Sequence, residues 1–353
     1  MGTKSILVFS HFALHTSHFL SKEIKEEKVD FQIKALIIAF IITVGLALSI
    51  IPILKKLKVG QIERDDGPES HLKKQGTPTM GGIIMIIAVT VITIGIFLYY
   101  INKEANMAKN MLALLITAIG FGLIGFIDDF KKLVLKNTKG LKPAYKMLGL
   151  LIISVAYVMY LIYIVKNGTD IIIPILNINL ELPVIIYIPF AIFILLATSN
   201  AINLTDGIDG LSTSVTTIII TCLTVIGIIY DIKEVAVFGS IVVGACLGFL
   251  IFNLHPAKVF MGDTGSLLLG GVIASLALYL KVPLLLIIIA LIPILETCSV
   301  IIQVAYFKKT GKRIFKMAPL HHHFELSGWN ENKIVSIFTL ITLVLCIVGL
   351  NLI

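Results

Sequence analysis

Long apolar segments dominate the chain, and they limit its possible fold more than any other feature. A bilayer core roughly 30 Å thick needs about 20 apolar residues in each helix that crosses it. The chain is 57% hydrophobic and 14% charged, whereas about 25% of the residues in a soluble domain are charged. The sequence therefore predicts an all-α polytopic membrane protein. We expect ten transmembrane helices, near residues 35–54, 80–101, 111–128, 146–165, 184–202, 211–230, 235–253, 264–281, 283–305 and 333–352.

Lysine and arginine gather in alternate loops between these segments. They fill the first, third and ninth loops: Lys55, Lys56, Lys58, Arg64, Lys73 and Lys74; Lys131, Lys132, Lys136, Lys139 and Lys142; Lys308, Lys309, Lys312, Arg313 and Lys316. Cytoplasmic loops of membrane proteins carry such an excess of positive charge. We therefore expect these loops in the cytoplasm and both termini outside. The net charge of +8 follows this pattern, so we expect no nucleic-acid partner.

Two parts of the chain lie outside the helical pattern. Residues 1–33 are expected to form an N-terminal arm, either interfacial or of artificial origin, because "SILVFSHFAL" is too short to span a bilayer and "SKEIKEEKVD" is polar. The stretch Thr169–Pro183 is rich in isoleucine and broken by Pro174, which predicts a short β-hairpin on the outer, periplasmic surface. No loop is long enough for a soluble domain, so residues 34–353 are expected to form a single transmembrane domain.

A first polar cluster ends an apolar segment in "FGLIGFIDDF". A single aspartate at this point could simply be solvated among lipid headgroups. Asp128 and Asp129 are adjacent, however, and two carboxylates in a low dielectric repel each other until a divalent cation or a proton relieves them. Ionisable groups at membrane depth are functional by default. We therefore predict that this pair takes part in chemistry.

A second cluster interrupts the apolar chain in "SNAINLTDGIDGLSTS". It holds Asn200, Asn203, Asp206, Gly207 and Asp209. The two aspartates are three residues apart, so at a helix start they would share one face. A turn with one aspartate as the N-cap of the next helix is the alternative, but it does not explain the other polar residues. We therefore predict a ligand site here.

A third cluster lies in "FNLHPAKVFMGDTGSLLLGG", where "GDTGS" is typical of a helix start that binds anions. Asp263 is itself negative, so it suits a metal ion better than a phosphate. Phe260 could stack on a base, although core packing is the commoner role of a single phenylalanine.

The histidines of "MAPLHHHFELSGW" form a fourth cluster. His321, His322 and His323 are consecutive and cannot all point one way, whereas zinc prefers spaced ligands with cysteine or carboxylate. The adjacent "KKTGKRIFK" favours an anionic ligand instead. Two weaker signals are the rigid loop "HLKKQGTPTMGG" and the pair Glu296 and Gln303, which could hydrogen-bond between helices.

These clusters combine carboxylates for Mg²⁺, helix N-termini for phosphate and lysines for further negative charge, as phosphoryl transfer requires. The motifs "GFIDDF", "NAINLTDGIDGL", "NLHPAKVFMGDTGS" and "APLHHHFE" resemble those of the bacterial polyprenyl-phosphate N-acetylhexosamine-1-phosphate transferases. Within that superfamily, "RIFKMAPLHHHFELSGW" and "TPTMGG" resemble the phospho-N-acetylmuramoyl-pentapeptide-transferases. The resemblance extends from about residue 35 to the end of the chain.

The resemblance implies an Mg²⁺-dependent enzyme of the bacterial plasma membrane, usually a homodimer, with its active site on the cytoplasmic face. It would transfer phospho-MurNAc-pentapeptide from UDP-MurNAc-pentapeptide to undecaprenyl phosphate, giving lipid I and UMP. The implied catalytic residues are Asp128, Asp129 and Asp263, with Asp263 as the metal ligand and one of the other two as the base. The implied substrate-binding residues are Lys74, Thr79, Lys132, Asn200, Asn203, Asp206, Gly207, Asp209, Asn253, Phe260, Ser266, His321, His322 and His323.

Two alternatives remain at this stage. A sister enzyme would use UDP-GlcNAc on the same scaffold, although the "HHHFE" block favours the MurNAc-pentapeptide substrate. A secondary transporter would place its polar site near the bilayer midplane, whereas these clusters sit on one face. For the transfer itself we expect direct attack by the lipid phosphate, and a phospho-aspartate intermediate on Asp128 is the open alternative.

Overall fold

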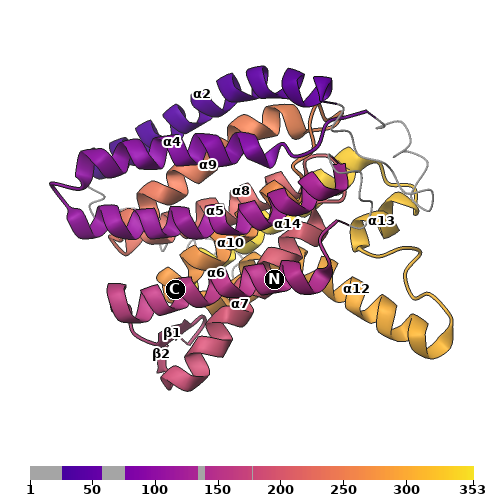
Figure 1. Cartoon of the computed structure of the whole chain (residues 1–353). Coiled ribbons are helices and arrows are strands. Elements are labelled where there is room, and N and C mark those ends of the chain that lie inside the picture. Colours follow the sequence, from indigo (N-terminus) through magenta and orange to yellow (C-terminus); the bar gives the residue numbers. More distant parts are fainter. Residues whose placement is uncertain (1–25, 58–75, 134–139, 177) are drawn as a thin grey trace, which may run out of the picture.

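The protein is a bundle of long helices (Figure 1). The computed structural model describes residues 26–57, 76–133, 140–176 and 178–353. Within these residues, ten helices are long and apolar enough to cross a membrane, which confirms the predicted fold class and number of spans. They are α2 (Glu26–Lys56), α4 (Gly82–Tyr100), α5 (Ala105–Leu133), α6 (Pro143–Tyr160), α7 (Val184–Thr205), α8 (Leu211–Ile229), α9 (Lys233–Asn253), α10 (Gly262–Tyr279), α12 (Leu291–Thr310) and α14 (Glu331–Leu350).

Helix α10 forms the centre of the bundle, and α5 and α7 pack against it. Every residue of α10 from Thr264 to Tyr279 is buried. Small residues make this close packing possible, as in many membrane bundles. A Cβ atom at Gly270 of α10 would lie 2.5 Å from the Cα atom of Ser199 in α7. The polar residues at the ends of these helices are therefore held close together.

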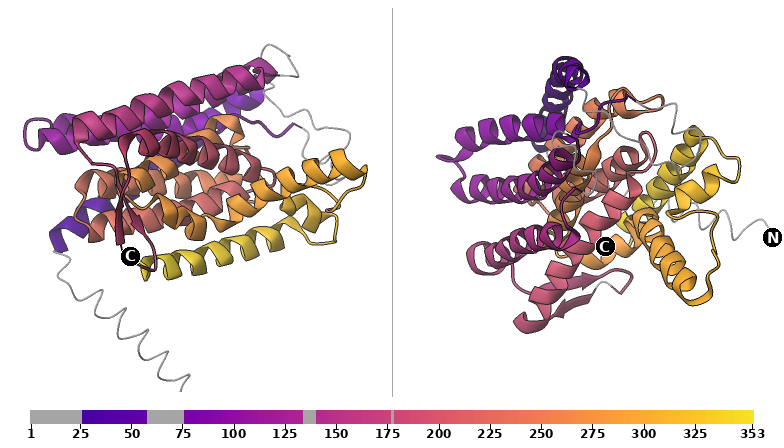
Figure 2. Two further views of the ribbon diagram at one scale, coloured as in Figure 1. Left: turned by 90° about the horizontal axis from the view of Figure 1, so that it is seen from below. Right: turned by 45° about the vertical axis from the view of Figure 1, so that its right-hand side comes forward.

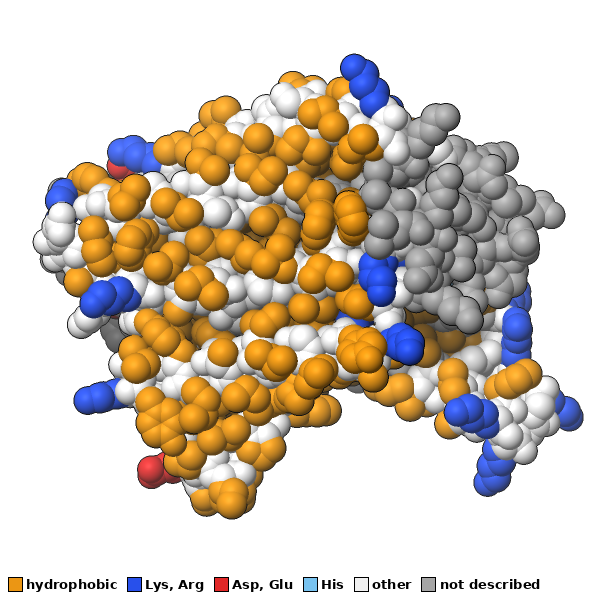
Figure 3. Space-filling model, viewed as in Figure 1, with side chains coloured by type: hydrophobic (Ala, Val, Ile, Leu, Met, Phe, Trp, Pro, Cys, Tyr) orange, Lys and Arg blue, Asp and Glu red, His pale blue; other side chains and the backbone are white. Residues whose placement is uncertain are grey.

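The sides of the bundle are apolar, as expected for a surface that contacts lipid. Figure 3 shows hydrophobic side chains along the flanks of the helices, with Lys and Arg side chains towards the two ends of the bundle. Ile41 of α2, Leu98 of α4 and Ile152 of α6 are among the large apolar side chains exposed there. A soluble protein rarely exposes so continuous an apolar surface.

A two-stranded antiparallel sheet interrupts the helices, which confirms the predicted hairpin. Strand β1 (Asp170–Ile173) pairs with β2 (Ile178–Glu181), and Asp170 lies opposite Glu181. β-Branched isoleucines favour this extended conformation. The hairpin projects from the bundle near the start of α7 (Figure 2). Lys281, just after α10, fixes it through an ion pair of 2.7 Å with Asp170.

The ninth span differs from the prediction because the chain breaks where a continuous helix was expected at 283–305. A 3₁₀ turn, η2 (Pro283–Leu285), leads into the short α11 (Leu286–Ile289), and α12 begins only at Leu291. Pro293 explains the break. Proline has no N–H, and its ring clashes with the carbonyl four residues earlier, so it favours the first turn of a helix over the interior. Helix α12 then leans away from the bundle (Figure 1).

The first span is longer than predicted because α2 begins at Glu26. The last part of the predicted N-terminal arm is therefore helical and continuous with this span. Residues 1–25 of that arm lie outside the described residues.

Candidate active site

Two aspartates from different helices meet at one end of the bundle and share two lysines. Lys132 Nζ lies 2.7 Å from Asp128 Oδ2 and 3.0 Å from Asp263 Oδ2. Lys146 Nζ, from α6, lies 3.6 Å and 2.9 Å from the same two oxygens. We call these four residues the acid–lysine cluster. Two ammonium groups here balance two convergent carboxylates.

Local geometry explains why Asp128 and Asp263 come so close. Asp128 and Lys132 are four residues apart on α5 and therefore face the same way. Gly125, one turn earlier, lets α5 touch the start of α10, since a Cβ atom there would lie 2.1 Å from the carbonyl oxygen of Asp263. The backbone N–H of Leu141 also donates to Asp128 Oδ1 at 2.6 Å. Backbone contacts as well as side chains hold the cluster together.

Asp129 points away from its neighbour and binds the start of α10. Its Oδ2 accepts hydrogen bonds from the Thr264 N–H at 2.9 Å and the Thr264 hydroxyl at 2.6 Å, and its Oδ1 accepts one from the Asp263 N–H at 3.2 Å. Successive helical residues are about 100° apart, so Asp128 and Asp129 face different partners. Asp129 therefore satisfies free N–H groups of α10 and complements the positive end of its dipole.

Asn203 and Ser266 lie next to Asp263, the metal-ligand candidate. Asn203 Nδ2 donates to Asp263 Oδ1 at 2.8 Å and to Ser266 Oγ at 2.9 Å. Ser266 Oγ in turn donates to the Gly262 carbonyl at 3.0 Å. These bonds fix the orientation of the Asp263 carboxylate from the side of α7.

The expectation that Asp206 and Asp209 share a face of a helix is wrong, because both lie in the turn between α7 and α8. Helix α7 ends at Thr205 and α8 begins at Leu211. The N-cap of α8 is Gly210, which has a φ of +76° and no side chain to cap with, so neither aspartate caps α8. The positive φ favours glycine at this position.

Asp206 is surrounded by other acids. Burial, followed by the negative charges of Asp263, Asp129 and Asp209, raises the pKa of its carboxyl well above the ordinary value. An acid in such a field is stabilised either by a proton or by a nearby cation. The α7–α8 turn therefore adds negative charge near Asp263, which a cation would neutralise.

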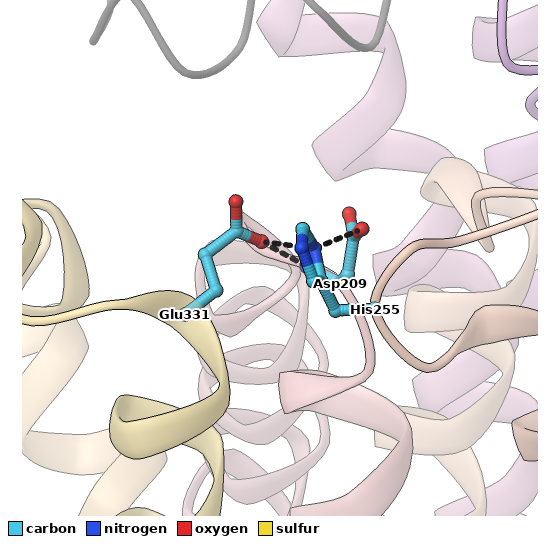
Figure 4. A group of neighbouring side chains, drawn as sticks. All are labelled: Asp209, His255 and Glu331. Atoms are coloured by element: carbon cyan, nitrogen blue, oxygen red, sulfur yellow. Dashed lines mark hydrogen bonds and ion pairs between the residues drawn. The ribbon is translucent and has the colours of Figure 1, made fainter.

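A second group of side chains joins the α7–α8 turn to distant parts of the chain (Figure 4). His255 Nδ1 lies 3.0 Å from Asp209 Oδ2 and 3.7 Å from Glu331 Oε2. The Asp209 N–H donates to Glu331 at 3.3 Å, and the Ala257 N–H donates to Asp209 at 3.0 Å. One ligand atom from each of Asp209, His255 and Glu331 lies within 4.8 Å of the others, so the group could hold a metal ion. Mixed nitrogen and carboxylate donors suit zinc or manganese better than Mg²⁺.

Sequence reasoning did not predict Lys146, His255 or Glu331 as site residues. Lys146 follows Pro143 at the start of an apolar segment, and a lysine at that depth was a usable signal. His255 stood within the motif "NLHPAKVFMGDTGS". Glu331 gave no comparable signal, because only the fold brings α14 beside the α7–α8 turn.

Asn253 and Asn200 both make hydrogen bonds within the protein. Asn253 is buried, where its side chain accepts from the Thr213 hydroxyl at 2.7 Å and donates to the Val259 carbonyl at 3.0 Å. Its amide therefore braces the α9–α10 loop. Asn200 Nδ2 donates at 2.7 Å to the Leu196 carbonyl, one turn back in α7.

The predicted loop before α4 pairs with the loop before α10. The Phe260 N–H donates to the Pro78 carbonyl at 2.8 Å, and the Gly81 N–H donates to the Phe260 carbonyl at 2.8 Å. The Phe260 side chain is half-buried, and Thr79 is buried beside Gly262. Lys74 lies outside the described residues.

The three histidines lie on the short helix α13 (Leu320–Glu325) and point to different partners. Glu296 of α12 accepts from the His321 N–H at 3.2 Å, and His322 Nδ1 lies 2.7 Å from Glu325 Oε2. His323 Nδ1 accepts from the Lys316 N–H at 3.1 Å.

His321 reaches the α7–α8 turn. Its Nε2 would lie 2.0 Å from a Cβ atom at Gly207, which explains the glycine there. The fully buried imidazole makes no hydrogen bond through either ring nitrogen within the described residues, and Nδ1 lies in an ion-pair contact 3.2 Å from Glu296 Oε2. The structure therefore brings His321 to the turn.

Glu296 and Gln303 of α12 both hold the segment that leads to the histidines. Gln303 Oε1 accepts hydrogen bonds from the backbone N–H groups of Ile314 and Phe315, at 3.1 Å and 3.0 Å. The expectation of hydrogen bonds between helices is therefore confirmed for Glu296, which bonds to α13, whereas Gln303 bonds to the loop between α12 and α13.

Comparisons with known proteins show which sequences this chain resembles. Residues 111–281 match the model of glycosyl transferase family 4. A curated phospho-N-acetylmuramoyl-pentapeptide-transferase of Clostridium botulinum (strain Alaska E43 / Type E3) is 51% identical over 90% of this chain and 95% of its own length. Proteins of the same name from Clostridium perfringens (strain 13 / Type A) and Acetivibrio thermocellus are 50% and 46% identical, over 90% and 89% of this chain and 97% and 92% of their own.

Proposed function

The chain belongs to the phospho-N-acetylmuramoyl-pentapeptide-transferases, and we propose that it transfers phospho-MurNAc-pentapeptide from UDP-MurNAc-pentapeptide to undecaprenyl phosphate. An oxygen of the lipid phosphate bonds to the phosphorus that carries the sugar. The bond from that phosphorus to UMP breaks, which gives lipid I and UMP. The observation that carries this proposal is the acid–lysine cluster, in which Asp128 and Asp263 converge at one end of a membrane bundle.

Mg²⁺ fits this cluster by charge and by donor type. Mg²⁺ prefers oxygen ligands and is bound in many phosphoryl-transfer sites by one or two carboxylates together with substrate phosphates. Asp263 would supply a carboxylate ligand, and burial together with the charges of Asp263, Asp129 and Asp209 raises the pKa of the neighbouring Asp206. When bound, the ion would neutralise charge on the diphosphate. Lys132 and Lys146 currently hold the carboxylates of Asp128 and Asp263 and would turn towards the phosphates.

We assign different roles to the two adjacent aspartates. Asp129 is occupied by the first N–H groups of α10, so it positions Asp263. Asp128 would accept the proton of the lipid phosphate as that oxygen attacks, and direct attack needs no covalent enzyme intermediate. A phosphorylated Asp128 trapped by rapid quench would contradict direct attack.

The uridine diphosphate would lie between the α7–α8 turn and the α9–α10 loop. Asn203 and Ser266, bonded to each other beside Asp263, would face the phosphates together with Lys132. The nucleoside would be surrounded by Asp206, Gly207, Asp209 and the half-buried Phe260, and the Phe260 ring would stack on uracil. Thr79, Asn200 and Lys74 complete the proposed substrate site, and Asn253 supports it by bracing the loop.

The histidine segment would contact the sugar and peptide. His321 reaches the turn at Gly207, while His322 and His323 lie on the same short helix.

We propose that this site opens to the cytoplasm at the bacterial plasma membrane, with both termini outside, and that the enzyme is a homodimer. The alternating loop charges support this orientation.

The direct test is Mg²⁺-dependent release of UMP from UDP-MurNAc-pentapeptide in the presence of undecaprenyl phosphate. Asp263→Ala should abolish release, because it removes a carboxylate shared by both lysines. Asp170→Asn, an acid at the outer end of the bundle, serves as the matched control and should keep full activity. Preferred turnover of UDP-GlcNAc would assign the chain to the sister activity instead. Full activity of Asp263→Ala would refute the proposed site.

A further inference from the structure

The second half of α12 and the loop that follows it project from the bundle as a basic arm, which we define as residues 300–316. Figure 1 shows α12 leaning away from the other helices, and the right-hand view of Figure 2 shows the same. From residue 301 to residue 314, every side chain except that of Gln303 is exposed. The protein itself therefore covers little of this arm.

The basic arm divides into an apolar part and a charged part. Its helical part exposes large apolar side chains, among them Ile301, Val304 and Phe307. The basic side chains gather at the helix end and in the loop beyond it: Lys308, Lys309, Lys312, Arg313 and Lys316. A bilayer has the same order, because its hydrocarbon core is bordered by headgroups. The apolar part therefore suits the core, and the cations suit the headgroup level.

No acidic side chain balances these cations locally. The sequence has no aspartate or glutamate between Glu296 and Glu325. Among the residues that the structure describes, the side chains of Lys308, Lys309 and Lys312 have no ion-pair partner. At the opposite end of the bundle, by contrast, lysines such as the one that fixes the hairpin are paired with carboxylates at 2.7 Å. The arm therefore carries positive charge that an anion outside the described residues would neutralise.

Hydrogen bonds hold the charged part of the arm in a defined position. Gly311, with a φ of +69°, ends α12, and its N–H donates to the Phe307 carbonyl at 2.9 Å. The loop then folds back on the helix, where Gln303 Oε1 accepts from two backbone N–H groups and Gln303 Nε2 donates to the Phe315 carbonyl at 3.2 Å. The cations therefore sit at a fixed place beside the exposed apolar side chains.

We propose that the basic arm binds the headgroups of anionic phospholipids. Clusters of lysine and arginine beside a membrane helix attract anionic lipids. Lys308, Lys309 and Lys312 contact the lipid phosphates, and the apolar part of the arm lies among the acyl chains. A soluble anion would neutralise the same charge but would leave the apolar part uncovered. An anionic lipid is therefore the partner that fits both parts of the arm.

A tryptophan on the arm tests this through quenching by brominated lipids. Phe307→Trp in a Trp329→Phe background leaves one tryptophan in the chain, on the arm. The full chain is reconstituted in bilayers of phosphatidylcholine and phosphatidylglycerol with matched acyl chains, and either lipid is brominated in turn. Phosphatidylglycerol should be enriched about tenfold around the reporter, which is the combined effect of three exposed charge pairs. Salt at about 1 M should lower this enrichment, because the Debye length shrinks to roughly 3 Å.

The charge of the arm is then removed or kept. Lys308→Gln, Lys309→Gln and Lys312→Gln together should bring the enrichment close to one, whereas arginine at the same three positions should keep it. Thermal unfolding of each variant establishes that it is folded, and the salt dependence supplies the same test should the glutamine variant fail to fold. Equal quenching by the two lipids, or an enrichment that the glutamine variant retains, would overturn the proposal.

Phe193→Trp in the same Trp329→Phe background is the matched reporter. Phe193 is exposed in the middle of α7, a helix without a charged residue, so the two lipids should quench this tryptophan equally. Inorganic phosphate, added at constant ionic strength, should leave the enrichment at the arm unchanged. Loss of the enrichment in phosphate would overturn the proposal, because it would assign the cations to a soluble anion.

Discussion

Replacing Gly125 of α5 by alanine places a single methyl group against the backbone of the first turn of α10. The new Cβ atom would lie 2.1 Å from the carbonyl oxygen of Asp263, where ordinary contact begins at 3.4 Å. One of the two helices must therefore shift by roughly 1.3 Å, and a misplacement of about 1 Å in an active site lowers the rate on the order of 100-fold. Overpacking costs about 1–3 kcal/mol, while alanine gains about 1 kcal/mol over glycine in a helix.

The expected result is therefore a large loss of rate with a small loss of stability. UMP release gives the rate, and thermal unfolding in detergent gives the stability. Gly120→Ala on the same helix is the control, because its Cβ atom would meet only the flexible side chain of Ile153, at 3.1 Å. A Gly125→Ala enzyme with nearly full activity, or an equal loss in Gly120→Ala, would refute the argument that this backbone contact sets the position of Asp263.

Two further predictions concern charge. Lys146→Met removes one of the two ammonium groups shared by Asp128 and Asp263, so kcat/KM should fall about 10- to 100-fold. The exposed Lys142→Met, at the N-cap of α6, should have no such effect, and equal losses would count against the cluster. Asp206→Asn should stabilise the metal-free protein at pH 8 but not near pH 4. The pKa of Asp206 is raised above its ordinary value of 3.8 in the folded state, so the folded protein holds this proton more tightly than the unfolded chain. The contribution of this bound proton to the stability of the folded state is lost as pH rises above 3.8, by about 1.4 kcal/mol per pH unit. Unfolding in EDTA across this pH range measures the slope, and identical slopes for both proteins would exclude the effect.

Local sequence signals predict where the membrane spans lie. They also predict that the polar residues gather at one end of the bundle. Long apolar runs fix the helices, and the glycines and aspartates that interrupt them mark where helices begin and end. The glycines and Asp263 of "GDTGS" correctly indicate a helix start, although α10 begins at Gly262, two residues before the predicted span. The break before α12 was missed because hydropathy is continuous there, and only the steric demand of Pro293 reveals it.

The role of a residue that depends on which way its side chain points could not be predicted from the sequence in the same way. Asp128 and Asp129 look like an equivalent pair, yet the helical rotation between them sends one to the lysines and the other to α10. Asp206 and Asp209 lie in a turn because Gly207 and Gly210 stand beside them. Contacts between residues far apart in sequence, such as that of His255 with Glu331, require the packing of α14 to be known.

The lysines between Asp128 and Asp263 also bear on how such a protein matures. In small zinc domains the ion is part of folding, because the ligands repel one another without it. Here Lys132 and Lys146 already pair with Asp128 and Asp263, so the two carboxylates have counter-ions without a metal ion. The Mg²⁺ proposed for this site would therefore be required for the reaction and not for the fold.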